Sequence, residues 1–340
     1  MNFISRFKNQ RSNRGGREIR LSFVAGVLLL AALGWFGFRS FIKAASEIGF
    51  LQGASSANLQ DSFAQQQKLQ ELLLETRPTN KSDQENFSLL ARSGISVFVD
   101  GERTKTLFSQ QADKQVPIAS LTKLITAFAV LEHYDLTHVV TVSEEAVGEE
   151  GEGGFLRPGD RFTVRQLLYP LLIESSNDAA SALAEVIGKE NFVELMNREA
   201  ENLGLQETVF INPTGLDPNG ESNEVNRSSA RDIARLAEEI ALRHPEAFSI
   251  LEIKTYDLFD AAGHFHHTLF TTNELLGYTE WPTQVLGGKT GWTPKAKGNL
   301  LLVLRAPKER GMLFDVVLGA DDRFGQMKSL VDWVYTSYLW

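Results

Sequence analysis

The spacing of hydrophobic residues divides the chain into an apolar run near its start, a polar stretch, and a long segment of strand and helix patterns. Leu21 to Phe38 is a run of 18 residues without a charge. Residues 44–88 are rich in Ser, Gln, Asn and Glu, with one dense apolar cluster at Leu72-Leu73-Leu74. We therefore expect a polar stalk over residues 44–88 and one folded domain over residues 89–340.

Strand patterns occupy both ends of the expected domain, and helix patterns occupy its middle. The predicted strands are Gly94–Asp100, Lys105–Phe108, Leu251–Phe259, Gly287–Trp292, Asn299–Arg305 and Leu313–Gly319. The predicted helices begin at Ser120 and after Thr163, and continue with Asp178–Ile187, Asn191–Leu203, a helix capped by Ser228 that runs to Leu242, and Phe324–Leu339. This order differs from the β-α alternation of a parallel sheet. It predicts an α+β fold, in which an antiparallel sheet from both ends of the domain encloses an inserted all-helical subdomain. The ends of the domain should then lie close together.

Local sequence signals support several of these boundaries. Thr163-Val164-Arg165-Gln166 is a capping box in front of an apolar helical run. Gly188 and Gly204 each follow a helical pattern, at the position where a glycine commonly ends a helix. The helical middle is therefore expected to consist of several short helices with defined ends.

The N-terminal residues predict a membrane anchor. Residues 1–20 carry six arginines and lysines and one glutamate, and the uncharged run follows at once. A single transmembrane signal anchor over residues 21–43 should leave residues 1–20 in the cytoplasm and the rest of the chain on the periplasmic or cell-wall side. A cleaved signal peptide is the alternative, since Ala44-Ala45-Ser46 is small enough for a processing site.

Charge and cysteine content narrow the possible functions. The first 45 residues hold eight of the 34 basic and one of the 43 acidic residues, so the remainder carries 26 basic and 42 acidic residues. Such an acidic domain is a poor candidate for binding nucleic acid. The chain has no cysteine, which excludes disulfides, thiolate metal sites and a cysteine nucleophile.

Ser120 and Lys123 form the first candidate catalytic pair. Pro117 favours an extended approach, and apolar residues recur at helical spacing from Ser120 onward. A serine at a helix start lies at the positive end of the helix dipole, and a lysine three residues later lies on the same side. This arrangement suits a serine nucleophile, its base and part of an oxyanion hole.

Two further segments carry chemistry in the same chain. Ser175-Ser176-Asn177 falls between two predicted helices, where a turn can direct Ser175 and Asn177 into a cleft. Lys289-Thr290-Gly291 lies in a strand entered through Gly287-Gly288, where missing side chains let a ligand approach the backbone. The three motifs Ser-x-x-Lys, Ser-x-Asn and Lys-Thr-Gly, occurring in this order, indicate a catalytic site more strongly than any one of them alone.

With these motifs, the chain resembles the low-molecular-mass penicillin-binding proteins that act as serine-type D-alanyl-D-alanine carboxypeptidases. The similarity covers about residues 90–340. It rests on these segments: Pro117-Ile118-Ala119-Ser120-Leu121-Thr122-Lys123, Ser175-Ser176-Asn177-Asp178-Ala179-Ala180, Asn212-Pro213-Thr214-Gly215-Leu216, Ser229-Ala230-Arg231-Asp232 and Lys289-Thr290-Gly291-Trp292-Thr293. The resemblance implies a β-lactamase/transpeptidase-like fold.

The resemblance also implies roles for three catalytic residues. Ser120 would attack the carbonyl of a D-Ala-D-Ala peptide bond and form an acyl-enzyme. Lys123 would accept the serine proton, which requires a neutral amine. Ser175 would pass a proton toward the leaving amine, and water would complete the hydrolysis. The residues implied to bind substrate are Asn177, Lys289, Thr290, Gly291, the backbone of Trp292, and Thr293.

The implied function is a carboxypeptidase of peptidoglycan stem peptides that β-lactams inhibit covalently and that needs no metal or cofactor. A D,D-endopeptidase would use the same residues, so that alternative stays open. A β-lactamase of the class that shares these motifs needs a glutamate-bearing loop. The segment at the equivalent distance, Phe210 to Gly215, has no carboxylate. A non-catalytic peptidoglycan-binding protein on the same fold is the remaining alternative.

Three features depart from the resemblance or lie outside it. Many of these carboxypeptidases carry a further C-terminal β-domain and an amphipathic membrane helix, whereas Trp340 follows directly on the last predicted helix. The stretch Glu144 to Gly154 holds five glutamates and four glycines and predicts a solvated loop near the cleft. His264-Phe265-His266-His267 alternates as a strand does and lacks an evident fourth ligand, which disfavours a zinc site.

Overall fold

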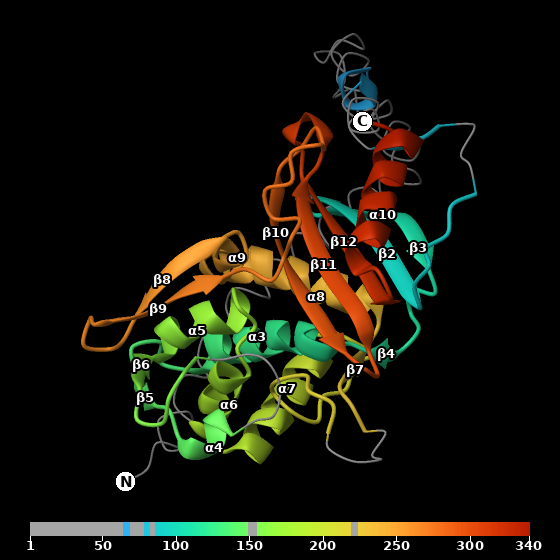
Figure 1. Ribbon diagram of the computed structural model, residues 1–340. Helices are drawn as coiled ribbons and strands as arrows, with labels where there is room; N and C mark the ends of the chain where they lie inside the picture. Colours follow the sequence, from blue (N-terminus) through green and yellow to red (C-terminus); the bar gives the residue numbers. More distant parts are fainter. Residues whose placement is uncertain (1–63, 69–77, 82–85, 149–154, 219–223) are drawn as a thin grey trace, which may run out of the picture. The chain divides into compact units, whose positions relative to one another are not determined.

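The computed structural model describes residues 64–68, 78–81, 86–148, 155–218 and 224–340 (Figure 1). The chain divides into two units, Met1–Arg77 and Pro78–Trp340. In the first unit, residues 64–68 are helical. The anchor predicted over residues 21–43 lies outside the described ranges, and no helix within them is long and apolar enough to cross a bilayer.

A five-stranded antiparallel sheet forms the centre of the second unit, in the order β10-β11-β12-β2-β3. Its strands are β2 (Ser93–Asp100), β3 (Arg103–Gln110), β10 (Val285–Thr293), β11 (Lys297–Arg305) and β12 (Met312–Ala320). The sequence predicts all five to within a few residues. Strands from the two ends of the domain meet where β12 pairs with β2, and β1 (Thr79–Asn80) pairs with β13 (Tyr338–Leu339). The predicted antiparallel sheet and the predicted closeness of the domain ends are therefore confirmed.

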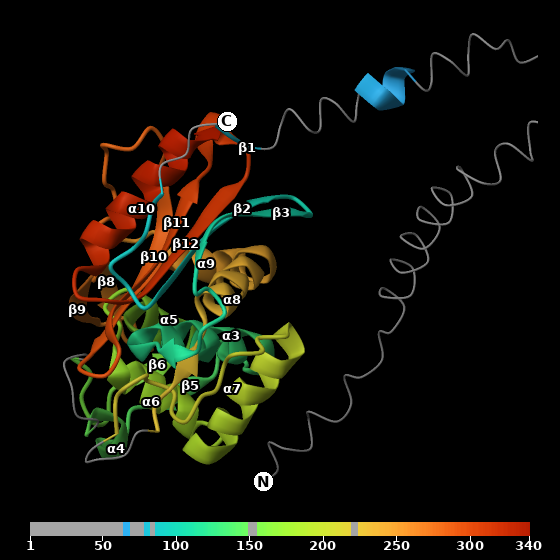
Figure 2. The same cartoon turned by 90° about the vertical axis from the view of Figure 1, so that its right-hand side faces the viewer.

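Helices cover both faces of this sheet. One face packs on α10 (Arg323–Ser337), and the other packs on α8 (Ala230–Arg243), as Figure 2 shows with the sheet seen nearly edge-on. The inserted helical block lies beyond α8. It contains α3 (Lys123–His133), α4 (Glu144–Val147), α5 (Val164–Leu172), α6 (Asn177–Glu185), α7 (Lys189–Leu203) and α9 (Pro245–Ile250). One apolar cluster fills the space between the sheet and this block, and a second lies under α10.

Short elements connect these layers. They are the 3₁₀ turns η2 (Ala119–Thr122) and η3 (Pro307–Glu309) and the two-stranded pairs β4 (Val116–Pro117) with β7 (Arg227–Ser228), β5 (Val139–Thr141) with β6 (Arg161–Thr163), and β8 (Thr255–Phe259) with β9 (Phe265–Phe270). In Figure 1 the β8–β9 hairpin projects away from the sheet beside α5.

Local capping signals predict helix ends well. Thr163 and Gln166 form the predicted capping box of α5, and Gly204 ends α7 with a left-handed φ of 68°. One predicted boundary is wrong by a residue. Ser229 rather than Ser228 caps α8. Ser228 pairs in β7, and the Ser229 hydroxyl accepts the hydrogen bond from the Asp232 amide.

The beginning of the first predicted helix also needs correction. Ser120 lies in η2, and the α-helix proper begins three residues later at Lys123. Ala119 has a φ of +48°, so the chain turns sharply before it can continue as an α-helix. In a 3₁₀ turn, side chains three residues apart are eclipsed. The predicted juxtaposition of Ser120 and Lys123 therefore survives the change of helix type.

Asp315 is a buried carboxyl in the apolar layer under α10. It lies on β12 opposite Ser96 of β2 and is fully buried, and neither of its side-chain oxygens has a partner among the described residues. Burial raises the pKa of Asp315 to about 7. The folded state therefore favours the protonated acid, whereas the unfolded chain releases the proton at about pH 4.

We expect Asp315→Asn to stabilise the domain more at alkaline than at acidic pH. Because the native pKa is raised, the wild type loses stability as pH rises from about 4 through 7. The neutral amide removes that dependence. The gain in unfolding free energy should be about 3 kcal/mol larger at pH 8 than at pH 5, measured by denaturant unfolding. Asp321→Asn, at a side chain that is 92% exposed, is the control. Equal gains at both pH values would contradict the prediction.

Candidate active site

Ser120 lies in η2 and Lys123 begins α3, and η2 packs against β10 of the sheet. The side-chain nitrogen of Lys123, Nζ, is 3.1 Å from the Ser120 hydroxyl oxygen, Oγ. Lys123 is fully buried, whereas Ser120 is half-buried. The hydroxyl can therefore meet a ligand while the amine stays away from bulk water.

Two fixed acceptors determine how the Lys123 amine is oriented. Nζ donates to Asn177 Oδ1 at 2.8 Å and to the backbone oxygen of Thr214 at 2.7 Å. A neutral amine has two N–H groups and one lone pair. If both N–H groups bind these acceptors, the lone pair is left for the Ser120 hydroxyl proton. The geometry thus suits proton transfer from Ser120 to Lys123.

The loop that carries Thr214 is packed tightly against the nucleophile turn. Asn212 Oδ1 accepts a 2.7 Å hydrogen bond from the Gly215 amide. Asn226 Nδ2 donates to the backbone oxygen of Asn212 and to Thr122 Oγ1. Gly215 has a φ of +85°, and a Cβ there would lie 2.1 Å from the Ala119 oxygen. Sequence analysis singled out this Asn-Pro-Thr-Gly segment but did not assign Thr214 to the site.

Ser175 and Lys289 form the second close pair. Lys289 Nζ donates to Ser175 Oγ at 2.7 Å and to the Thr290 oxygen at 3.0 Å. Ser175 has a φ of +67°, a conformation that non-glycine residues adopt mainly where tertiary contacts hold it. Burial, and then the positive charge of Arg323, lower the pKa of Lys289 to about 7. The charge on Lys289 is therefore sensitive to pH near neutrality.

Strand β10 passes directly beside the nucleophile turn. A Cβ on Gly291 would lie 3.0 Å from the Ser120 amide nitrogen and 2.9 Å from the Ile118 oxygen. Only glycine allows this approach, which brings the backbone of the Gly291–Trp292 step next to the Ser120 N–H. The Trp292 side chain is 60% exposed. The Thr290 hydroxyl is hydrogen-bonded to that of Thr272 at 2.5 Å.

Thr293 lies at the end of β10, where its hydroxyl is engaged in the following turn. It donates to Asp217 Oδ1 at 3.0 Å and accepts from the Ala296 amide at 3.1 Å. Asp217 Oδ2 also accepts from the Lys295 amide. The structure therefore places Thr293 in the support of the turn, and Asp217 is a neighbour that no sequence motif indicated.

Arg323 is a further cation that sequence analysis missed. Its Nη1 donates to the Gly291 oxygen at 3.3 Å, and its Nε is buried without a partner among the described atoms. Arg323 begins α10, far along the sequence from the Lys-Thr-Gly motif. No local pattern marks it, because only the packing of α10 on the sheet brings it to β10.

The histidines of the β9 strand bind carboxylates and one another. His266 contacts Asp160 and His267, and His267 contacts Glu174. Across the described ranges, no three histidine or acidic side chains converge in a way that could hold a metal ion. Of the acidic stretch after Ser143, residues 144–147 form α4, and residues 149–154 lie outside the described part of the chain.

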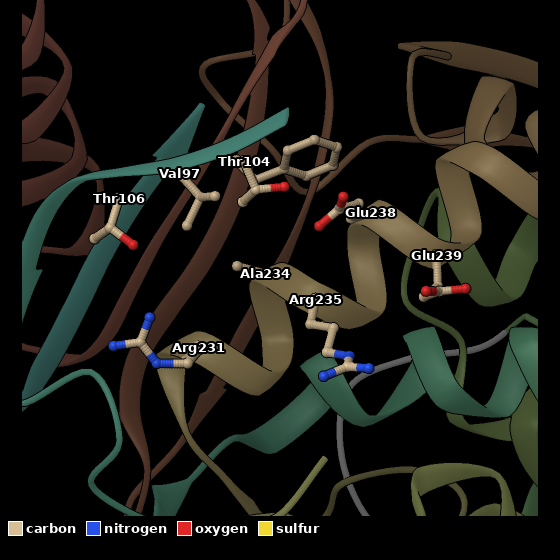
Figure 3. A pocket seen from close by; sticks show the side chains of 9 residues that line it. Val97, Thr104, Thr106, Arg231, Ala234, Arg235, Glu238 and Glu239 are labelled. Carbon is tan, nitrogen blue, oxygen red and sulfur yellow. The ribbon is translucent and has the colours of Figure 1, made fainter. Parts of the chain in front are cut away.

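A pocket of about 330 Å³ lies elsewhere, between α8 and strands β2 and β3 (Figure 3). Val97, Phe314 and Ala234 form its apolar wall, and Arg231 and Glu238 are among its polar residues. None of the predicted site residues lines it. It is therefore separate from the cluster around Ser120.

Comparison with known proteins places this cluster in a family. The family model described as D-alanyl-D-alanine carboxypeptidase matches residues 80–322. The chain belongs to this family. The match includes every segment that contributes to the Ser120–Lys123 and Ser175–Lys289 pairs.

Curated members of the family are similar over most of this chain. The D-alanyl-D-alanine carboxypeptidase DacF of Bacillus subtilis is 33% identical over 76% of this chain and 66% of its own length. DacC of Escherichia coli is 33% identical over 70% of this chain and 60% of its own length. The chain thus spans less than two thirds of these relatives. A D-alanyl-D-alanine endopeptidase of Pseudomonas aeruginosa is 34% identical over 71% of this chain and 74% of its length.

Solved structures share the fold. A D-alanyl-D-alanine carboxypeptidase of Mycobacterium tuberculosis superposes with a TM-score of 0.65 at 26% identity, over 76% of this chain and 96% of that chain. The Streptomyces K15 DD-transpeptidase superposes with a TM-score of 0.64 at 26% identity, over 74% of this chain and 99% of that chain. The domain therefore has the fold of penicillin-binding and transpeptidase proteins.

Proposed function

We propose that this protein is a serine-type D-Ala-D-Ala carboxypeptidase that acts on peptidoglycan stem peptides and is acylated by β-lactams. The observation that carries the proposal is the contact of a fully buried lysine amine with a half-buried serine hydroxyl, supported by two fixed acceptors on that amine. Membership of the carboxypeptidase family supports the choice of substrate.

Acylation begins when Ser120 Oγ attacks the carbonyl carbon of the penultimate D-alanine. The hydroxyl proton moves to the lone pair of Lys123 Nζ while Asn177 and Thr214 hold its two N–H groups. The carbonyl oxygen becomes an oxyanion, which we assign to the amides of Ser120 and Trp292 because β10 passes so close to the nucleophile turn. The carbon–nitrogen bond then breaks as the leaving amine receives, through Ser175, the proton that Lys123 accepted, and terminal D-alanine leaves.

Binding of the substrate carboxylate is assigned to Lys289 and Thr290. Lys289 contacts Ser175, and Arg323 adds positive charge behind the same strand. Gly291 keeps the strand close to the nucleophile, and Thr293 supports the turn after it through Asp217. Water hydrolyses the acyl-enzyme and regenerates the Ser120 hydroxyl.

Release of D-alanine tests this function directly. The full chain should liberate one D-alanine from a muropeptide pentapeptide ending in D-Ala-D-Ala, and prior treatment with penicillin should stop the release. Mass spectrometry should show one covalent penicilloyl adduct. Absence of both release and adduct would overturn the proposal and favour a non-catalytic peptidoglycan-binding role.

A D,D-endopeptidase is the second candidate, and the similarity to the Pseudomonas aeruginosa endopeptidase favours it specifically. Cleavage of crosslinked muropeptide dimers, compared with trimming of pentapeptides by the same preparation, distinguishes the two. For a β-lactamase we expect no rapid turnover of a chromogenic cephalosporin, since no carboxylate occupies the segment Phe210 to Gly215.

We also propose that residues 21–43 anchor the protein in the cell membrane, with the basic residues 1–20 in the cytoplasm. The stalk expected over residues 44–88 would end by residue 77, since β1 already pairs with β13 in the second unit. Residues 78–340 would then act outside the cytoplasm, where peptidoglycan is found. The uncharged run and its basic flank support this topology. Protease digestion of intact and permeabilised spheroplasts should cleave the domain from outside and leave the basic tail protected.

The affinity for carboxylate-terminated substrates should weaken as pH rises through about 7. Lys289 has a pKa lowered to about 7, so its cation is lost above that pH. Between pH 6 and pH 8 the KM for an acyl-D-Ala-D-Ala peptide should rise about tenfold. Lys289→Arg, which stays charged, should flatten this dependence. A KM that does not change over this range in the wild type would contradict the assignment.

A further inference from the structure

Four polar side chains form a continuous chain that ends one residue before Ser175. Asp160 Oδ2 is 2.8 Å from His266 Nε2, the two Nδ1 atoms of His266 and His267 are 2.6 Å apart, and His267 Nε2 is 3.3 Å from Glu174 Oε2. These side chains are between 10% and 21% exposed. The chain thus connects the β9 strand and the segment before β6 to the end of α5.

The partners of each nitrogen determine where the protons lie when both imidazoles are neutral. An ionised Asp160 can only accept, so His266 donates through Nε2 and presents Nδ1 as an acceptor. His267 must then donate through Nδ1, which leaves its Nε2 as an acceptor. The atom facing Nε2 is a carboxyl oxygen of Glu174, which can donate only if it carries a proton. The chain of contacts therefore requires a neutral Glu174.

The surroundings of Glu174 favour the same state. Its Oε1 is buried without a partner in the described part of the chain. Burial, and then the negative charge of Asp178, raise the pKa of Glu174 to about 7. Burial and the neighbouring His266 lower the pKa of His267, against a smaller opposing effect of Asp160, which favours the neutral imidazole. Geometry and electrostatics thus agree on a protonated carboxyl next to Ser175.

The position of Glu174 gives this proton a consequence for the active site. The next residue, Ser175, has a left-handed backbone and binds Lys289, and Asn177 two residues further binds Lys123. Ser176 caps α6 between them. Ionisation of Glu174 would remove the donor for His267 and place a second carboxylate beside Asp178. The strained turn would then lose its link to β9.

We propose that Glu174 is a positioning residue, and that its neutral carboxyl, bonded to His267, holds the Ser175 turn in the conformation that supports acylation. This inference rests on the proposed acylation of Ser120. The charged and titratable groups that face Glu174 are His267 from β9, with His266 and Asp160 behind it, and Asp178 from α6. Lys289 from β10 reaches the adjacent Ser175 hydroxyl.

The limiting acylation rate at saturating fluorescent penicillin tests the proposal across pH 5.5 to 8.5. Glu174→Gln keeps a donor for His267 that cannot ionise. The ratio of variant to wild-type rate should be near one at pH 6 and rise to about five or more at pH 8. Using a ratio cancels the pH dependence that both proteins share, including that of Lys289. Glu238→Gln is the matched control, because burial also raises the pKa of Glu238, which lines the separate pocket in Figure 3.

Each outcome decides between a positioning role and its absence. A ratio that stays constant with pH, whether near one or uniformly low, would overturn the inference while leaving the proposed function intact. No acylation of the wild type at any pH would overturn the proposed function and this inference with it. If Glu174→Gln does not fold, nitrogen NMR of the wild type at pH 6 decides. We expect the Nε2–H tautomer for His266 and the Nδ1–H tautomer for His267, and an Nε2–H tautomer for His267 would overturn the inference.

Discussion

Ser120→Ala is expected to abolish covalent labelling by a β-lactam. The Ser120 hydroxyl is the oxygen that contacts the Lys123 amine, and it lies beside the backbone of β10, where an oxyanion can be stabilised. Removing it deletes the atom that forms the acyl bond, so labelling should fall below detection instead of merely slowing. The measurement is gel fluorescence and intact mass after incubation with a fluorescent penicillin.

The Ser120→Ala protein should fold normally, because the Ser120 side chain is only half-buried and Lys123 keeps its contacts with Asn177 and Thr214. Ser329→Ala, on an exposed position of α10, is the matched control and should label at the wild-type rate. Labelling of Ser120→Ala at a normal rate would assign the nucleophile to another residue and end the proposed mechanism.

Lys123→Arg is expected to give a folded protein that is acylated roughly 10² to 10⁴ times more slowly. A base must accept the Ser120 proton, and general-base assistance contributes a factor of roughly 10² to 10⁴. A guanidinium stays protonated at any accessible pH and has no lone pair for that proton. It can still donate to Asn177 Oδ1 and to the Thr214 oxygen, so these two acceptors keep a hydrogen-bond donor.

Stopped-flow acylation kinetics and a thermal melt together test this variant. Lys114→Arg, at an exposed position, should match the wild type in both measurements. Because Lys123 is fully buried, a lowered melting temperature would be consistent with the larger guanidinium. Acylation retained within tenfold of the wild type would assign the base elsewhere.

Much of the secondary structure follows from local physics and could be predicted from the sequence. The capping box at Thr163 and the left-handed glycine at Gly204 act through residues within one helical turn, so their signals are complete in a short segment. The helix α9 escaped prediction. Its six residues fall between the helix predicted to end at Leu242 and the strand predicted to begin at Leu251, and an apolar run that short carries no distinct period.

The sequence by itself also determined the chemistry of the site. Hydroxyl, amine and amide side chains in three ordered motifs specified Ser120, Lys123, Ser175, Asn177 and Lys289, and the structure brings these residues into two contacting pairs joined through α6. That much was predictable because each motif is local, and the order of the elements required the two ends of the sheet to meet.

Tertiary structure alone decided the rest. The contact of the Thr214 carbonyl with Lys123 is not evident from its own segment, and Asp217 and Arg323 reach the site from segments without a motif. The lowered pKa of Lys289 comes from burial and from Arg323, which is distant in sequence, and the raised pKa of Glu174 comes first from burial. Desolvation and Coulomb interactions depend on distances in space, which packing sets and a linear pattern does not contain.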